Sequence, residues 1–465
     1  MTTTQDPTGT RFDPDLRKIS LTVVMGTIMT MLDATIVNVA INVLGRDLHV
    51  SLSTVQWVVT GYTLALSMTI PITGWAIGRF GGRTTWIVSL ALFGAGSVLC
   101  GAAWSAGALI AFRVLQGVGG GLLMPIAQTL LARAAGPERM GRVMAVISVP
   151  AMLAPVLGPL LGGVLVDHLD WRWMFYVNVP VCAVALLLAV RLLPRDEEAR
   201  ADGCLDVLGM ALLSPGLAAL VYGLSQIGET AGGGRATAAL ALGAVLVAAF
   251  VAHSLRRAGR ALIDVRLFRD RGLATSAAAL FCYSVGVFGV LLLVPLYSQS
   301  LPGTSVLDAG LLVAPMGAGA IVTMPLAGRL TDRLGARLPG VAGIVTVLAG
   351  VLACALVDLS AGTVPLAAAL FVIGLGHGLV TPSIMAAAYR TLPRSSVPGA
   401  ATASQIVVRV GTALGTAVIA VILQWLTRSG GTGAEAFAGS FRWALAIIAV
   451  SLVPALLLPV PRKTA

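Results

Sequence analysis

Long apolar stretches constrain this chain more than any other feature of its sequence. Fourteen of them occur, each about 20 residues or longer, and roughly 20 apolar residues in a helix cross the hydrocarbon core of a bilayer. Only 11% of the 465 residues are charged, whereas a soluble protein carries about 25%. The sequence therefore predicts an all-α integral membrane protein, because the stretches are too long for the ~10-residue strands of a β-barrel.

The basic residues predict how these spans are oriented. With the N-terminal tail (1–18) inside, the cytoplasmic tails and loops hold 24 Lys and Arg, the outer loops hold five, and two lie within spans. Because basic residues concentrate on the cytoplasmic side, we expect a multi-pass protein of a bacterial inner membrane with both termini, including the tail 461–465, in the cytoplasm. The predicted spans are 19–43, 55–77, 84–104, 107–132, 143–166, 173–193, 205–227, 236–255, 273–299, 306–330, 339–359, 364–390, 400–426 and 441–460.

The chain also repeats itself. GVGGGLLMPIAQTLLAR (117–133) matches GLGHGLVTPSIMAAAYR (374–390) at an offset of 257, and GWAIGRFGGR (74–83) matches GRLTDRLGAR (328–337) at an offset of 254. Such parallel repeats are related by an axis along the membrane normal. We therefore predict a six-helix bundle in 19–193, a second in 273–460, and between them a linker, 194–272, with two extra spans and a basic cytoplasmic loop.

One carboxylate, Asp33, lies inside the first span. A charge at the centre of a transmembrane helix costs about 3 kcal/mol or more, so such residues are functional candidates; an Asp that only pairs with a neighbouring helix is the alternative. Arg113 lies in the fourth span with Gln116 on the same helix face, and contact between Arg113 and Asp33 is geometrically feasible. A purely structural ion pair remains open here.

The repeat shows which polar residues have no counterpart. Arg113 aligns with Leu370, and Asp33 has no acidic equivalent, so the ionisable side chains are concentrated in the first half. His377 is expected to be packed or to line a cavity rather than to titrate, and Arg409 to meet either substrate or a backbone carbonyl. The candidates for a cavity lining are Asn38, Gln116, His377 and Arg409.

Several motifs together resemble the major facilitator superfamily, in its fourteen-helix drug:proton antiporter branch. They are LDATIVNVA (32–40), FRVLQGVGGG (112–121), APVLGPLLGG (154–163), WRWMFYVNVP (171–180), LIDVRLFRDR (262–271) and GRLTDRLGAR (328–337). The resemblance implies proton-coupled export of hydrophobic or cationic drugs by alternating access, with Asp33 and Arg113 in proton coupling. It also implies an antiporter motif in the fifth span, for which a plain packing groove is the alternative: Gly158, Pro159, Gly162 and Gly163.

The loop motif G-x-L-x-D-R-x-G-x-R departs from the family pattern once. Gly78 occupies the position of the Asp in the first half, whereas Asp332 is present in the second. In the family that Asp helps to close the cytoplasmic side, so we expect a one-sided lock through Asp332 and nearby arginines such as Arg333. The other lock residues implied are Gly74, Arg79, Arg83, Gly328 and Arg337.

The remaining expectations concern partners. The linker 194–203 reads as a solvated loop, and the basic stretch 253–272 either binds anionic lipid heads or is an ordinary loop. Neither lysine follows a glycine, so no ATP-binding P-loop exists; the histidines and cysteines are isolated. We expect no enzyme, cofactor, metal or nucleic acid, and a monomer acting on protons and a small molecule. Export of a lipid or metabolite, or a non-transporting receptor or structural protein, are the alternatives.

Overall fold

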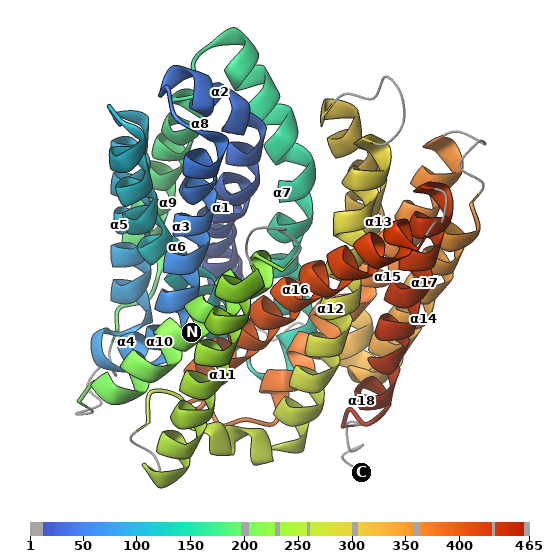
Figure 1. Ribbon diagram of the computed structural model, residues 1–465. Helices are drawn as coiled ribbons and strands as arrows, with labels where there is room; N and C mark the ends of the chain where they lie inside the picture. The colour runs from blue at the N-terminus through green and yellow to red at the C-terminus, as the bar shows by residue number, and fades with distance from the viewer. Residues whose placement is uncertain are drawn as a thin grey trace.

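The computed structural model describes residues 13–196, 204–227, 233–257, 261–299, 306–357, 363–429 and 433–459, and all regular structure in these ranges is helical (Figure 1). Thirteen helical segments are long and apolar enough to cross a membrane, and α7 is a further helix of 29 residues. The chain is a multi-pass membrane protein.

The first bundle is built from the N-terminal helices, several of which continue through short 3-10 turns. They are α1 (Pro14–Ile36) with η1 (Val37–Ala40) and α2 (Ile41–Asp47), α3 (Leu52–Thr69) with η2 (Ile70–Ile72) and α4 (Thr73–Phe80), α5 (Gly82–Gly101), α6 (Ala106–Ala135), η3 (Pro137–Arg139), α7 (Met140–His168), α8 (Trp173–Tyr176) and α9 (Asn178–Leu192).

The second bundle follows a pair of helices between the two. That pair is α10 (Val207–Ser225) and α11 (Gly233–Arg256), and η4 (Val265–Arg269) leads from it into α12 (Arg271–Gln299), α13 (Val306–Leu334), α14 (Arg337–Leu356), α15 (Thr363–Arg390), α16 (Val397–Arg428), α17 (Gly433–Val450) and α18 (Leu452–Leu456).

The sequence repeat has the same packing role in both bundles. A Cβ at Gly117 of α6 would come within 2.6 Å of the Tyr62 carbonyl on α3, and one at Gly374 of α15 would collide with the Met316 carbonyl on α13. Glycine at these positions lets two helix backbones approach closely. The paired loop glycines Gly81 and Gly335 also share a left-handed φ of 86° and 84°, a backbone conformation that glycine adopts without steric cost.

The two bundles approach one another at the end that carries both termini, which we call the termini side. Figure 1 shows α7 and α13 diverging at the opposite end. At the termini side, buried Gln128 of α6 accepts a hydrogen bond of 3.1 Å from the Tyr389 hydroxyl of α15. Of the α10–α11 pair, α10 packs against α3 and α16, and Trp57 of α3 stacks on Tyr222 of α10 with ring centroids 6.1 Å apart.

Two helices begin well before the membrane spans predicted for them. The first helix begins at Pro14 rather than at 19, because proline at the first helical position and Asp15 in the first turn favour a helix start that hydropathy does not register. The last long helix begins at Gly433 rather than at 441. Its first residues, GAEAFAGS, combine a charge and small side chains, which lower hydropathy without preventing helix formation.

Candidate functional site

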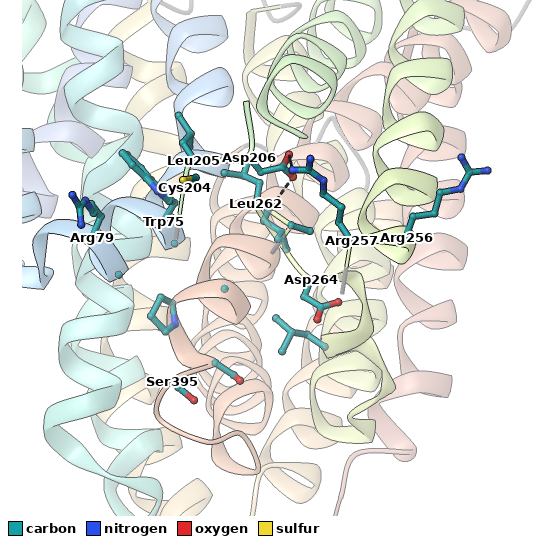
Figure 2. A pocket seen from close by; sticks show the side chains of 18 of the residues that line it. Trp75, Arg79, Cys204, Leu205, Asp206, Arg256, Arg257, Leu262, Asp264 and Ser395 are labelled. Carbon is teal, nitrogen blue, oxygen red and sulfur yellow. Dashed lines mark hydrogen bonds and ion pairs between the residues drawn. The ribbon is translucent and has the colours of Figure 1, made fainter. Parts of the chain in front are cut away.

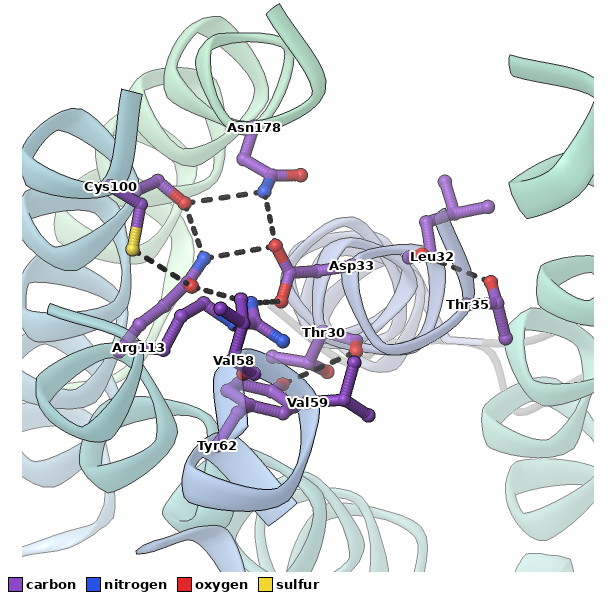
Figure 3. A network of polar contacts seen from close by, with 12 residues as sticks. Thr30, Leu32, Asp33, Thr35, Val58, Val59, Tyr62, Cys100, Arg113 and Asn178 are labelled. Carbon is purple, nitrogen blue, oxygen red and sulfur yellow. Dashed lines mark hydrogen bonds and ion pairs between the residues drawn. The ribbon is translucent and has the colours of Figure 1, made fainter. Parts of the chain in front are cut away.

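The candidate site is a buried ion pair inside the first bundle. Asp33 of α1 and Arg113 of α6 lie 2.5 Å apart, Oδ2 to guanidinium nitrogen, and their side chains are 0% and 1% exposed. Figure 3 shows Asp33 pointing from its helix toward Arg113 and Asn178. The contact foreseen between the first and fourth spans is therefore present.

The carboxylate of Asp33 receives further hydrogen bonds on its other oxygen. The side-chain amides of Gln116 and Asn178 donate to Oδ1 at 3.0 and 2.9 Å. The same two amides also donate to the Ser97 hydroxyl, at 2.6 and 3.2 Å. Both carboxylate oxygens are thus bound by donors from α6 and α9, which compensates part of the cost of burying the charge.

The guanidinium of Arg113 is held on several sides at once. It donates to the Gln116 side-chain oxygen at 2.7 Å and, through Nε, to the Val58 carbonyl at 3.2 Å. Its carbon lies 3.9 Å from the centroid of the Tyr62 ring, a cation–π geometry. These contacts use the planar, multi-donor shape of arginine, which lysine does not share.

Sequence reasoning found three members of this cluster and missed the others. Asn178, Ser97 and Tyr62 were not predicted as partners, and they come from α9, α5 and α3. Asn178 could have been recognised from the sequence, since it is an amide inside the motif 171–180 and at the start of an apolar helix. Nothing in the spacing of Ser97 distinguishes it from other serines in spans.

The remaining cavity candidates lie outside the cluster. Asn38 is exposed on η1. His377 is buried, and its two ring nitrogens lie 2.8 Å from the Tyr283 hydroxyl and 3.3 Å from the Thr381 hydroxyl. Arg409 is partly buried midway along α16.

Asp332 joins the two bundles at the termini side. It accepts a hydrogen bond from the Gly141 N–H at 2.8 Å and pairs with the Arg142 Nε at 2.8 Å, both at the start of α7. The prediction that Arg333 pairs with Asp332 was wrong, because Arg333 is exposed and, within the described residues, no bond joins it to Asp332. One residue along a helix turns the side chain by about 100°, so Arg333 points away.

Two glycines allow this contact. A Cβ at Gly328 of α13 would lie 2.8 Å from the Arg142 Cα, and one at Gly141 would lie 2.6 Å from the Gly328 carbonyl. Both distances are too short for a side chain, so the first glycine of the loop motif permits α13 and α7 to touch. In the first half, a Cβ at Gly74 would have ordinary contacts, 3.7 Å from Gly399 of α16.

The first-half loop receives a carboxylate from elsewhere in the chain. Asp196, after α9, accepts hydrogen bonds from the backbone N–H groups of Arg83 and Thr84 at 3.0 and 2.9 Å, and so caps α5 as a helix N-terminus favours. The linker 194–203, which was expected to be solvated, is therefore attached to the first-half loop at Asp196. Residues 197–203 lie outside the described residues. Arg83 donates to the Val190 carbonyl at 2.5 Å, inside its own bundle rather than across a lock.

A pocket of about 1030 Å³ opens where the first-half loop faces α16 (Figure 2). Gly78 and Arg79 line one side, and Ser396, just before α16, and Gly399 of α16 line another. The α16 N-terminus has no side-chain cap from Ser396. Because residue 78 is a glycine, it offers the start of α16 no carboxylate of the kind that Asp332 offers the start of α7.

The basic stretch after α11 folds back onto the protein. Asp206 accepts hydrogen bonds from the Gly209 and Leu262 N–H groups, at 3.0 and 3.1 Å, and lies 2.9 Å from the His253 ring. Burial acts to raise the pKa of Asp206, but the hydrogen bonds from Gly209, His253 and Leu262 outweigh it and lower the pKa below its ordinary range. Residues 261–264 are thereby fixed beside α10 and α11.

The glycines of the fifth-span motif divide between two environments. A Cβ at Gly158 would collide with the Thr35 hydroxyl of α1, and one at Gly162 would lie 3.0 Å from the Ile36 carbonyl, whereas one at Gly163 would meet nothing within 4 Å. Gly158 and Gly162 form a packing groove for α1 close to Asp33. The side chain of Pro159 lies outside the described residues.

Fold and site together define a helical membrane protein of two repeated bundles with a buried ion pair in the first. The sequence profile of the Major Facilitator Superfamily matches residues 23–416 and 278–465. The chain therefore belongs to the Major Facilitator Superfamily, and it is a membrane transporter rather than an enzyme.

Relatives and solved structures agree with this assignment. The chain is 39% identical over 421 residues to the "Multidrug resistance protein B homolog" of Mycobacterium tuberculosis, covering 89% of this chain and 77% of that one. It is 32% identical over 405 residues to the "Tetracenomycin C resistance and export protein" of Streptomyces glaucescens, covering 87% and 75%. A crystal structure of the human organic anion transporter MFSD10 shares the fold, with a TM-score of 0.66, 18% identity and coverage of 96% and 100%.

Proposed function

We propose that this protein exports hydrophobic drugs or related small molecules across the bacterial inner membrane in exchange for protons. The relatives named for multidrug resistance and for tetracenomycin C export support the cargo class and the direction. The observation that carries the proton coupling is the buried Asp33–Arg113 pair. A carboxylate surrounded by exchangeable donors inside a membrane is the kind of group that proton-driven transporters use.

The proposed proton cycle follows from the contacts of Asp33. While the carboxylate is ionised, Arg113, Gln116 and Asn178 hold it and join α1, α6 and α9. Protonation removes the charge that binds Arg113, and the helices can then shift relative to one another. The proton motive force supplies about 2.3 kcal/mol per charge for each 100 mV, enough to bias two conformations that differ by a few kcal/mol.

The topology that we propose has fourteen spans and both termini in the cytoplasm. The thirteen apolar helical segments and α7 make fourteen, and the excess of Lys and Arg at the termini side supports the orientation. The α10–α11 pair is then a hairpin inserted between two six-helix repeats. In this orientation the Asp332–Arg142 contact closes the cytoplasmic side.

One chain contains both bundles and the complete Asp33 cluster. This supports function as a monomer, whose partners are a small-molecule cargo and protons. Anionic lipids at the cytoplasmic stretch 253–272 fit its basic residues.

The experiment that tests this proposal replaces Asp33 by asparagine. Asp33→Asn keeps the size of the side chain and removes the titrating group, so we expect uphill export from energised vesicles to be lost while the protein remains folded in the membrane. Asp47→Asn, an exposed position at the end of α2, which continues from α1, is the matched control and should export normally. Proton-driven export that persists in Asp33→Asn would contradict the assignment.

A further inference from the structure

A stripe of polar residues runs along one face of α16. Thr402, Gln405, Arg409, Thr412 and Thr416 recur at intervals of three and four residues, which places them on one side of a helix. The stripe faces the first bundle: a Cβ at Gly74 of α4 would lie 3.7 Å from the Thr402 hydroxyl, and α16 packs against α4 and α6 of that bundle.

The members of this stripe differ in whether they have partners. The three threonine hydroxyls donate to carbonyls of their own helix, as in the 2.9 Å bond from Thr402 to Pro398. Within the described part of the chain, no hydrogen bond or ion pair reaches the Gln405 amide or the Arg409 guanidinium. Two strong donor groups, one helical turn apart, thus face the other bundle without acceptors.

The other charges inside the membrane decide which ligand Gln405 and Arg409 would favour. Away from the ends of the described spans the chain carries one carboxylate, Asp33, and that carboxylate is fully buried and bound by Arg113. Arg409 therefore has no counter-charge. At an effective dielectric of about 20, a cation about 6 Å from Arg409 would bind roughly 100-fold more weakly than a neutral compound, and an anion would gain a similar factor.

We infer that Gln405 and Arg409 form an acid-recognising subsite, and that the preferred cargo is an amphipathic organic anion rather than a cation. The planar fork of arginine pairs with two oxygens of a carboxylate or sulfonate, and the amide of Gln405 adds a third donor. This inference rests on the proposed export function and narrows its cargo from hydrophobic compounds in general to acidic ones, against the cationic compounds that the sequence resemblance also implied. It also assigns Arg409 to cargo rather than to a backbone carbonyl.

Three fluorescent probes on one aromatic scaffold test the subsite by binding alone. Dansylglycine is an anion, dansylamide is neutral and dansylcadaverine is a cation near neutral pH. With the full-length protein in phosphatidylcholine nanodiscs, we expect dansylglycine to bind at least tenfold more tightly than dansylcadaverine. Arg409→Gln should remove that preference, and Arg409→Lys should keep part of it because the charge remains. Arg428→Gln, at the exposed end of the same helix, is the matched control and should bind as the wild type does.

The outcomes separate the subsite from the transport proposal. Equal or tighter binding of dansylcadaverine by the wild type, or a preference for the anion that survives in Arg409→Gln, overturns the inference. If Arg409→Gln does not fold, the wild-type ranking and Arg409→Lys decide. In proteoliposomes with a proton gradient, an intact charge preference without export would count against the export proposal alone. Proton-driven export of the cation in preference to the anion would count against the subsite alone.

Discussion

Replacing Asp332 by asparagine should open the termini side of the protein. The carboxylate is bound to the Gly141 N–H and to Arg142, each at 2.8 Å, and its side chain is only 7% exposed. Asparagine keeps one acceptor oxygen for the backbone N–H but loses the charge that binds Arg142. Hydrogen bonds to charged groups contribute about 1.5–3 kcal/mol, so we expect this contact to weaken by about 2–3 kcal/mol.

That free energy is large compared with the usual difference between transporter conformations. About 2–3 kcal/mol corresponds to a roughly 30- to 150-fold shift of a two-state equilibrium. The contact exists only where α13 and α7 touch, so the whole shift favours the state in which they separate. Transport should fall because the cycle stalls in that state, although the Asp33 cluster is unchanged.

A distance measurement between the bundles checks this prediction. Spin labels on the termini-side ends of α7 and α13, in a background without the five native cysteines, should report a longer distance in Asp332→Asn. Asp15→Asn, which breaks an exposed Asp15–Lys18 pair of 2.9 Å, is the matched control and should change nothing, because exposed pairs contribute little. An unchanged distance distribution and unchanged transport in Asp332→Asn would refute the lock.

Three further changes test other parts of the structure. Arg113→Lys keeps the charge but cannot bind Asp33, Gln116 and the Val58 carbonyl together, so proton-coupled transport in vesicles should fall severely with less effect on cargo binding; wild-type transport would make the arginine merely structural. Gly78→Asp places a carboxylate near the uncapped start of α16, and it should partly restore both transport and the short spin-label distance in the Asp332→Asn background. A folded double variant without any recovery would show that a carboxylate at position 78 does not act on α16 as Asp332 acts on α7. Because hydrogen bonds lower the pKa of Asp206, the stability that ionised Asp206 gives the fold is complete above the ordinary aspartate pKa and is lost as pH falls through the lowered pKa. The difference in melting temperature between wild type and Asp206→Asn should therefore shrink below about pH 4, and a difference that stays constant with pH would contradict this role of Asp206.

The pairing of Asp33 with Arg113 could be anticipated from the sequence because each is a charge in an apolar span. Such a charge requires a partner, and the choice of partners within the spans was small. The same argument did not identify Asn178 or Ser97. Amides and hydroxyls are common in transmembrane helices, and which of them meet Asp33 depends on how α5 and α9 are rotated about their axes.

The Asp332 contact between α13 and α7 shows the same division more sharply. The loop motif indicated that Asp332 matters, and its nearest basic neighbour in sequence is Arg333, but the contact is made by Arg142, 190 residues away. Asp196 likewise caps α5 across a separation that no local pattern encodes.

The sequence by itself determined the helical spans and their repeat, since in lipid every backbone hydrogen bond must be satisfied within the helix and apolar length alone therefore marks a span. Only the tertiary structure decided which polar side chains meet, because most faces of these helices are apolar and hydropathy carries little information about their rotation. The partners are set by close helix approach at glycines such as Gly141 and Gly328, where even one methyl group would separate the backbones.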